Sequence, residues 1–509
     1  MLKETFVMQQ DLIWSASLVD ALVAAFNRAE IVYSHWKSNI DLAQATAGEI
    51  DLDFLVDRRS LPQALTILAQ LGFKAADARW GTHPPSICHY YGLDPESKQL
   101  IHVHLFTRVL TGESFVKSHL LPFEAMLLEN VYPVNQMRVT AKPAELVLFT
   151  VRMFIKYGSL LDLLIVARKA KQIKKEALWL QAENSLPEAF ALLRHYCPVI
   201  DEKLFLACVE TISQNTSLWR RIRLARKVRQ RLSVYTKHSP SGRALAYLDL
   251  CWSEVQRRLG PKRKNRVLQG GGAVIAFVGA DATGKSTLVA ETGRWLGEVF
   301  TVAVIHTGKP PSSWVTAPIN LLLTLVRRRL PAQGSRDKEQ HNAETVPGAQ
   351  HHFRGLASLP YALRSVALAW DRRRLIARTR RQAAKGELII CDRYPSRTLG
   401  AMDSPRLEPA THQRGTLVKL YNYLARLESA LYRQIPPPDI VLRLHVSLET
   451  AKKRNRARNG QDDESYLEAR HRQSREWQMV GTRYEYVINT EQTLEATIDS
   501  VKEAIWSSL

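Results

Sequence analysis

The sequence predicts an α/β protein of more than one domain, with a parallel sheet covered by helices on both faces in its second half. A chain of 509 residues is longer than one hydrophobic core usually supports. From residue 273 onward, short apolar runs typical of buried strands alternate with segments of helical periodicity. In such a sheet, ligands bind at the carboxyl ends of the strands, so we expect a binding site there.

The strongest motif follows the first of these strands, the apolar run 273–277. Gly279, Gly284, Lys285 and Ser286 match the spacing G-x-x-x-x-G-K-[ST] of a phosphate-binding loop. Such a loop points backbone N–H groups at phosphate oxygens, while the lysine reaches the β- and γ-phosphates and the hydroxyl holds Mg²⁺. The sequence therefore predicts ATP and Mg²⁺ as cofactors. The residues expected at the nucleotide are Gly279, Ala282, Thr283, Gly284, Lys285, Ser286 and Thr287.

Two later segments fit the same chemistry. The apolar run 386–391 ends in Asp392, an arrangement in which the carboxylate binds Mg²⁺ through its water shell. Further on, Arg454, Arg456 and Arg458 stand at two-residue spacing beside a glycine. Guanidinium groups on such a segment suit a lid that stabilises a transferring phosphoryl group, and a solvated helix with charge pairs is the alternative.

Residues 273–509 resemble thymidylate kinase and its nucleoside-monophosphate kinase relatives. The loop contains Asp281, Asp371-Arg372 follows on a helix, Asp392-Arg393-Tyr394 ends a strand, and the arginine-rich lid comes last. The resemblance implies that Asp281 faces the acceptor sugar, that Arg372 and Arg393 serve the acceptor side, and that a lid arginine is catalytic because Ala282 leaves the loop without one. The catalytic residues it implies are Lys285, Asp281, Arg372, Arg393, Arg454, Arg456 and Arg458.

Three departures concern the acceptor. The family's Arg-Glu-Pro-Gly segment is replaced by residues 307–311, the polar insertion 327–352 has no counterpart, and His445 stands where the family often has Asp. The resemblance thus implies a phosphotransferase with a small-molecule acceptor whose identity stays open.

A second candidate site lies in the first hundred residues. Asp51 and Asp53 alternate along an apolar run, so both project from one face of a strand, where a divalent metal carrying a triphosphate would neutralise them. His102 and His104 likewise share one face of a later strand. Residues 30–110 resemble the nucleotidyltransferase superfamily, with the turn 37–39 before the D-x-D strand. The turn lacks glycine and no third carboxylate follows, so an active transferase and a domain that binds a nucleotide or nothing both stay open.

We expect three domains: a nucleotidyltransferase-like domain at 1–140, a basic helical subdomain and linker at 141–268, and the kinase-like domain at 269–509. The basic stretch 219–231 and the net charge of +22 suit contact with nucleic acid or an anionic membrane surface, or a solvated face that joins two domains. Five scattered cysteines without a C-x-x-C pair indicate a reducing compartment and argue against zinc and against a disulfide framework. With neither a secretion signal nor a membrane span of roughly 18 apolar residues, we expect a cytoplasmic protein, and a homodimer is compatible with that.

Three other functions compete with the kinase. The protein could be a regulatory NTPase without a small acceptor, or a nucleotidyltransferase acting on a sugar, a protein or RNA. The third is a non-enzymatic protein whose basic middle region binds nucleic acid or a membrane.

Overall fold

The computed structural model forms two compact units, residues 1–264 and 265–509. The division of the first unit at residue 140 stays a prediction. The described residues are 17–78, 86–112, 117–156, 160–182, 185–214, 218–237, 242, 266–308, 310–311, 316, 353, 355, 358–399, 401, 403–411, 413–457, 464–477 and 479–509, without the side chains of 160–169 and 218. The insertion 327–352 and Arg458 lie outside them. Within the described part of the chain, no helix is long and apolar enough to cross a membrane.

The first unit is built on a mixed sheet in the order β3-β4-β5-β2-β1-β9-β8. Only the pairs β2/β5 and β1/β9 are parallel. The strands of this unit are β1 (Tyr33–His35), β2 (Leu52–Val56), β3 (Lys74–Ala78), β4 (Ile87–Leu93), β5 (Leu100–Phe106), β8 (Val131–Val134) and β9 (Met137–Thr140), with a separate hairpin of β6 (Val109–Thr111) and β7 (His119–Leu121). Short helices accompany them: α1 (Leu18–Arg28), η1 (Asn39–Asp41), α2 (Leu42–Thr46), α3 (Leu61–Gln70) and α4 (Glu124–Glu129).

One face of this sheet is closed by α1 and α3, whose apolar residues share a core with Leu52, Phe54 and Val56 of β2. Phe26, Tyr33 and Phe54 form edge-to-face contacts there, with ring centroids 5.2 to 6.0 Å apart. Because strand residues alternate, Asp53 points to the opposite face, as the sequence predicts. That face carries the polar cluster described below.

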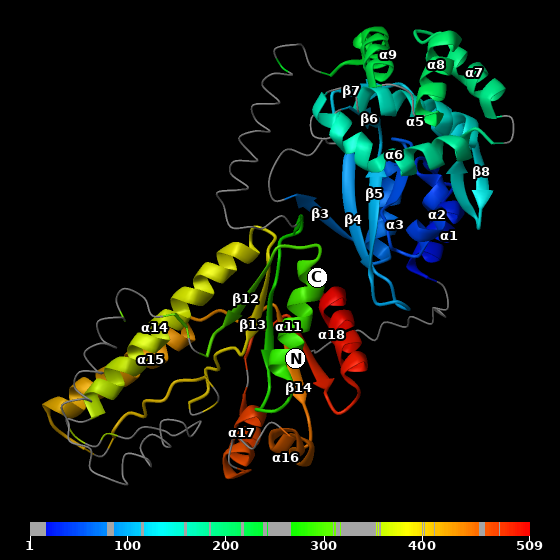
Figure 1. The fold of residues 1–509 in the computed structure, drawn as a ribbon. Helices are drawn as coiled ribbons and strands as arrows, with labels where there is room; N and C mark the ends of the chain where they lie inside the picture. Colours follow the sequence, from blue (N-terminus) through cyan, green and yellow to red (C-terminus); the bar gives the residue numbers. More distant parts are fainter. Residues whose placement is uncertain are drawn as a thin grey trace. The chain divides into compact units, whose positions relative to one another are not determined.

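Helices follow the sheet, as the sequence predicts for the middle of the chain: α5 (Lys142–Lys156), α6 (Leu160–Leu180), α7 (Ser185–Tyr196), α8 (Glu202–Ser213), α9 (Leu218–Arg231) and the short η2 (Ser233–Tyr235). Figure 1 shows them as the cyan-to-green part of the first unit. Helix α9 is the predicted basic helix, and it packs through Arg221 over the ring of Phe154 and through Arg229, which donates to the Ile155 carbonyl oxygen at 2.7 Å. The rest of its basic residues are mostly exposed. Contact with nucleic acid or a membrane surface stays a prediction.

The second unit holds the predicted parallel sheet, which is confirmed. Its order is β12-β13-β11-β14-β15 and every neighbouring pair is parallel. The strands of this sheet are β11 (Val274–Val278), β12 (Val302–His306), β13 (Leu388–Asp392), β14 (Ile440–His445) and β15 (Tyr484–Asn489). The short strand β10 (Arg266–Leu268) comes before them in the chain. The helices of this unit are α11 (Lys285–Gly297), α14 (Ser358–Ala383), α15 (Thr416–Arg433), α16 (Leu448–Ala457), α17 (Glu464–Glu476) and α18 (Leu494–Ser508).

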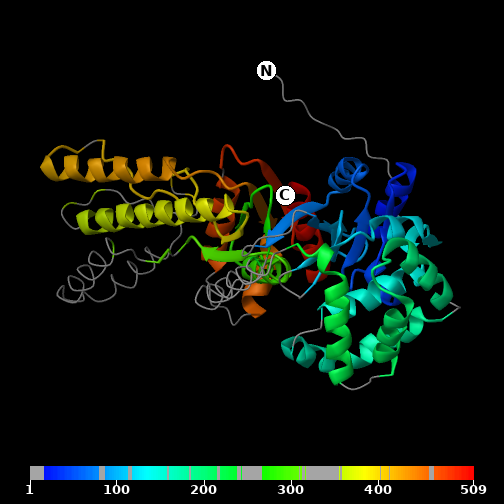
Figure 2. The same cartoon turned by 90° about the horizontal axis from the view of Figure 1, so that it is seen from above.

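Helices α14 and α15 run side by side and extend beyond the sheet, in both views (Figure 1 and Figure 2). Alternate residues of β11, Val274, Ala276 and Val278, share a core with Ala369 of α14 and Tyr432 of α15. Helix α11 contacts α18. The central strand β11 is thus fixed by two neighbouring strands and by packed helices, and its carboxyl end is a rigid place for a site.

The aromatic core of the first unit gives a stability prediction. Phe54→Ala should lower the free energy of unfolding by about 3–5 kcal/mol, because a fully buried ring is replaced by a cavity. Tyr132→Ala, at an exposed aromatic position of the same sheet, should cost well under half as much. Urea unfolding followed by circular dichroism measures both, and equal costs would contradict this account of the core.

Candidate functional site

The predicted phosphate loop joins β11 to α11 and has the backbone that its glycines permit. Gly279 has a φ of +156°, and a Cβ atom there would lie 2.9 Å from the carbonyl oxygen of Leu444 on β14. Gly284 caps α11 with a φ of +87°. Both positions therefore require glycine, since a side chain would collide or strain the backbone. The amino end of α11, which favours anions, begins at Lys285.

Lys285 is the buried cation of the loop. Its side chain is 7% exposed, and Nζ donates to the carbonyl oxygens of Gly279, at 2.9 Å, and Ala280. Burial lowers the pKa of Lys285 to about 8. Backbone carbonyls are weak partners for a desolvated ammonium, so phosphate oxygens would be better ones.

A chain of alternating charges runs from this loop through the second unit. Asp281 accepts from Arg470 Nε at 2.7 Å and from Arg393 Nη2 at 3.0 Å. Arg393 Nη1 is 3.8 Å from Asp403 Oδ2, and Asp403 Oδ1 accepts from Arg372 Nη2 at 3.0 Å. We call these five residues the charged chain. Burial raises the pKa of Asp281, but Arg470, Lys285 and Arg393 lower it more, so the carboxyl is ionised with a pKa below its usual value.

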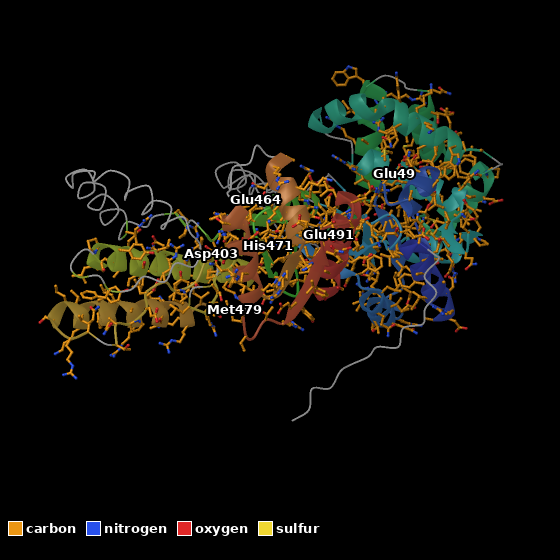
Figure 3. The ribbon with its side chains drawn as sticks, turned by 90° about the horizontal axis from the view of Figure 1, so that it is seen from below. Glu49, Asp403, Glu464, His471, Met479 and Glu491 are labelled. Carbon is orange, nitrogen blue, oxygen red and sulfur yellow. The ribbon has the colours of Figure 1, made fainter. Side chains whose placement is uncertain are left out.

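Two members of the charged chain, Arg470 and Asp403, were missed by sequence reasoning. Arg470 lies on α17, 9% exposed, with its guanidinium 5.6 Å from the centroid of the Tyr466 ring. Asp403 lies in the loop between β13 and α15, and Figure 3 labels it together with His471, the neighbour of Arg470. Spacing did not separate Arg470 from the other arginines of α17, and a lone aspartate in a loop carries no motif.

The predicted lid arginines differ from one another. Arg454 on α16 lies at the loop: Nη2 donates to the Thr490 carbonyl oxygen, and Nη1 lies 3.5 Å from the Ala282 carbonyl oxygen. Arg456 pairs instead with Glu464, and its side chain is 71% exposed. Arg458 is outside the described residues. The structure therefore brings Arg454, and not Arg456, to the phosphate loop.

Arg372 is fully buried and fully bonded. Nε donates to the Thr307 carbonyl oxygen at 3.1 Å and Nη2 to the Gly308 carbonyl oxygen at 2.9 Å. The remaining donors go to Asp403 and to the Tyr432 hydroxyl. A guanidinium has five N–H groups, so none is left for an acceptor phosphate in this arrangement. Arg372 instead fixes Thr307 and Gly308, the start of the segment 307–311.

Asp392 and Ser286 fit the predicted Mg²⁺. Asp392 ends β13 beside Phe277 of β11, and Oδ2 lies 3.0 Å from His306 Nδ1. Its Oδ1 is buried without a hydrogen-bond partner in the described part of the protein. Ser286 is exposed in the first turn of α11. A buried carboxylate oxygen in need of a partner and a serine hydroxyl are oxygen ligands of the kind that Mg²⁺ takes.

The second candidate site gathers on the polar face of the first unit's sheet. Asp53 binds Lys37 Nζ at 2.8 Å and lies 3.1 Å from His104 Nδ1, whereas Asp51 lies 2.7 Å from His102 Nδ1. The predicted shared face of these residues is confirmed. Burial raises the pKa of Asp53, but Lys37 and His104 lower it far more.

The turn before this strand works without glycine. Ser38 takes the left-handed φ of +58° that glycine would favour. Asn39 holds it, with its backbone N–H at 3.2 Å and Nδ2 at 2.7 Å from the two carboxylate oxygens of Glu145 on α5. Burial raises the pKa of Glu145 to about 8. Sequence reasoning missed Glu145, a buried carboxylate in the first turn of α5.

The comparisons with known proteins show no similarity in sequence and a weak similarity in structure. The sequence matches no protein-family model and no curated protein. Among solved structures, two of deoxyadenosine kinase from M. mycoides are similar, one with bound dATP and one with the products dCMP and dCDP. They are 17% and 18% identical, cover 45% and 46% of this chain and 97% and 99% of theirs, with a TM-score of 0.24 each. A TM-score of 0.24 is too low for this similarity to support a conclusion about this chain.

The buried lysine gives a pH prediction. Phosphate binding requires charged Lys285, whose pKa in the free protein is about 8. Above pH 8, binding must take up a proton, so the affinity for ATP should fall up to about tenfold per pH unit. Lys285→Arg stays charged and should lack this slope. Calorimetric titration across the alkaline range measures both; a wild-type slope no steeper than that of Lys285→Arg would contradict the role of this lysine.

Proposed function

We propose that the second unit is an ATP- and Mg²⁺-dependent phosphotransferase similar to nucleoside-monophosphate kinases. The observation that carries the proposal is the buried Lys285 beside Asp281, itself held between Arg393 and Arg470. A glycine turn with only a structural role would not need these buried charged side chains around it. Charge held in place before the substrate arrives is what phosphoryl transfer needs.

Each residue has a distinct task in this proposal. The loop amides and Lys285 bind the phosphates of ATP, and Arg454 stands over the loop at Ala282, where a lid arginine would stabilise charge on the transferring group. Asp392 and Ser286 would hold Mg²⁺, which when bound neutralises charge on the phosphates. Asp281 orients Arg393 and Arg470, and exchange of one of these contacts for an acceptor phosphate or hydroxyl would place the acceptor next to the loop.

A nucleoside monophosphate is the acceptor that we favour. By the sequence resemblance, Asp281 and Arg393 match residues that serve the acceptor in thymidylate kinases. Arg372 does not present a free N–H group, so Arg393 or Arg470 takes the acceptor phosphate in its place.

The same observation on Arg372 favours a second candidate, a regulatory NTPase that hydrolyses ATP without a small acceptor. If the segment fixed by Arg372 closes the acceptor side, water is the only nucleophile that reaches the phosphate.

Transfer of labelled phosphate from ATP to a panel of nucleoside monophosphates and sugars tests the proposal. We expect transfer to one acceptor class, and Lys285→Ala should weaken ATP binding about tenfold to hundredfold, because hydrogen bonds from a charged group are lost. Hydrolysis at a rate indifferent to every acceptor would favour the NTPase. Wild type and Lys285→Ala that behave alike on every acceptor would contradict both candidates.

A matched pair of arginines tests the charged chain. Arg470→Gln should lower kcat/KM for transfer by about tenfold or more, since Asp281 and the bound substrates lose a buried cation. Arg456→Gln removes an exposed arginine of the neighbouring helix and should change kcat/KM by less than about threefold. Steady-state kinetics on the acceptor found above measure both, and equal effects would contradict a special place for Arg470.

A further inference from the structure

Three histidines meet on the polar face of the first unit's sheet. His89 lies on β4 and His102 and His104 on β5, with His89 directly opposite His104 in the strand register. One ligand nitrogen from each can be chosen so that all lie within 4.8 Å of one another. The sequence motifs mark only His102 and His104, because β4 carries no motif.

Carboxylates orient two of these rings. His102 Nδ1 lies 2.7 Å from Asp51 Oδ1, and His104 Nδ1 lies 3.1 Å from Asp53 Oδ1. This is the arrangement in which a carboxylate takes the N–H of one ring nitrogen and leaves the other to a metal. His104 Nε2 is buried and has no hydrogen-bond partner in the described part of the protein. His102 Nε2 faces His89 Nδ1 at 3.2 Å.

The surroundings hold the three rings in place. Asp53 sits opposite His104 on the parallel neighbour β2, so the cluster spans three adjacent hydrogen-bonded strands. Tyr91 stacks on His102, with centroids 4.1 Å apart and planes 10° apart. Such a scaffold fixes ligand positions better than a loop does.

The three histidines do not fit Mg²⁺ as the divalent metal expected at Asp51 and Asp53. Mg²⁺ takes oxygen ligands in octahedral geometry, whereas three imidazoles suit zinc and its neighbours in the transition series. Asp53 is already neutralised by Lys37 at 2.8 Å, and Asp51, with its side chain 48% exposed, has an oxygen 3.5 Å from His104 Nε2.

We propose that His89, His102 and His104 bind one divalent transition-metal ion of the zinc class. Asp53 and Asp51 orient the rings, and Asp51 is also placed to complete the coordination. The site is independent of the kinase proposal, because its residues all belong to the first unit.

Titration of untagged, chelator-stripped full-length protein with Co²⁺, followed by Zn²⁺ competition, tests the proposal. We expect one Co²⁺ per chain with visible absorption typical of low coordination number, displaced by Zn²⁺ and not by Mg²⁺. His89→Gln and His104→Gln should each weaken binding by about 100-fold or more, as expected for a lost ligand. The control His195→Gln removes an exposed histidine of α7 and should bind like wild type.

Binding that these variants leave unchanged, or that Mg²⁺ displaces, would overturn the proposal. If the variants fail to fold, a measurement on the wild type alone still tests the proposal. Zn²⁺ should slow the modification of His89, His102 and His104 by diethyl pyrocarbonate, read by mass spectrometry, and leave His195 unchanged. Equal protection of all four histidines, or of none, would also overturn it.

Discussion

The Asp281 carboxylate is the interaction on which the second unit's site depends. It lies 3.9 Å from Lys285 Nζ, 3.0 Å from Arg393 Nη2 and 2.7 Å from Arg470 Nε. Three cations this close would repel one another strongly where water is scarce, and one shared carboxylate removes most of that cost. The contact also joins the phosphate loop, the end of β13 and helix α17 into one arrangement. Phosphate groups that enter such a site meet cations already in place, which is the electrostatic preorganisation that phosphoryl transfer uses.

Asp403 extends the same principle away from the loop. By pairing with Arg372 and standing near Arg393, it couples helix α14 to the strand end that carries Asp392. Arg372 spends all its donors on this support, so the residue predicted to contact an acceptor acts here as a brace for Thr307 and Gly308. The residues around the acceptor can therefore differ from those that the sequence predicts while the phosphate loop keeps its predicted form.

The sequence predicts features that depend on residues close together in the chain, and it does not predict contacts between residues that are far apart in the chain. The phosphate loop, the five parallel strands of the sheet and the shared face of Asp51, Asp53, His102 and His104 depend on local spacing, which a single sequence displays. Arg470, Asp403, His89 and Glu145 act through contacts with residues distant in the chain, and nothing in their neighbourhood marks them. Arg454 and Arg456 look equivalent by spacing, and only tertiary packing separates them. Ser38 can hold its left-handed backbone because buried Glu145 supports the turn from another element.

Hydrogen exchange of the full-length protein with and without ATP and Mg²⁺ tests the central claim most directly, because it reads the loop and α17 in one experiment. The account predicts that nucleotide slows exchange both in the loop 279–287 and in α17 around Arg470, and that Asp281→Asn uncouples the two. Protection confined to the loop in the wild type, or coupled protection that persists in Asp281→Asn, would contradict it.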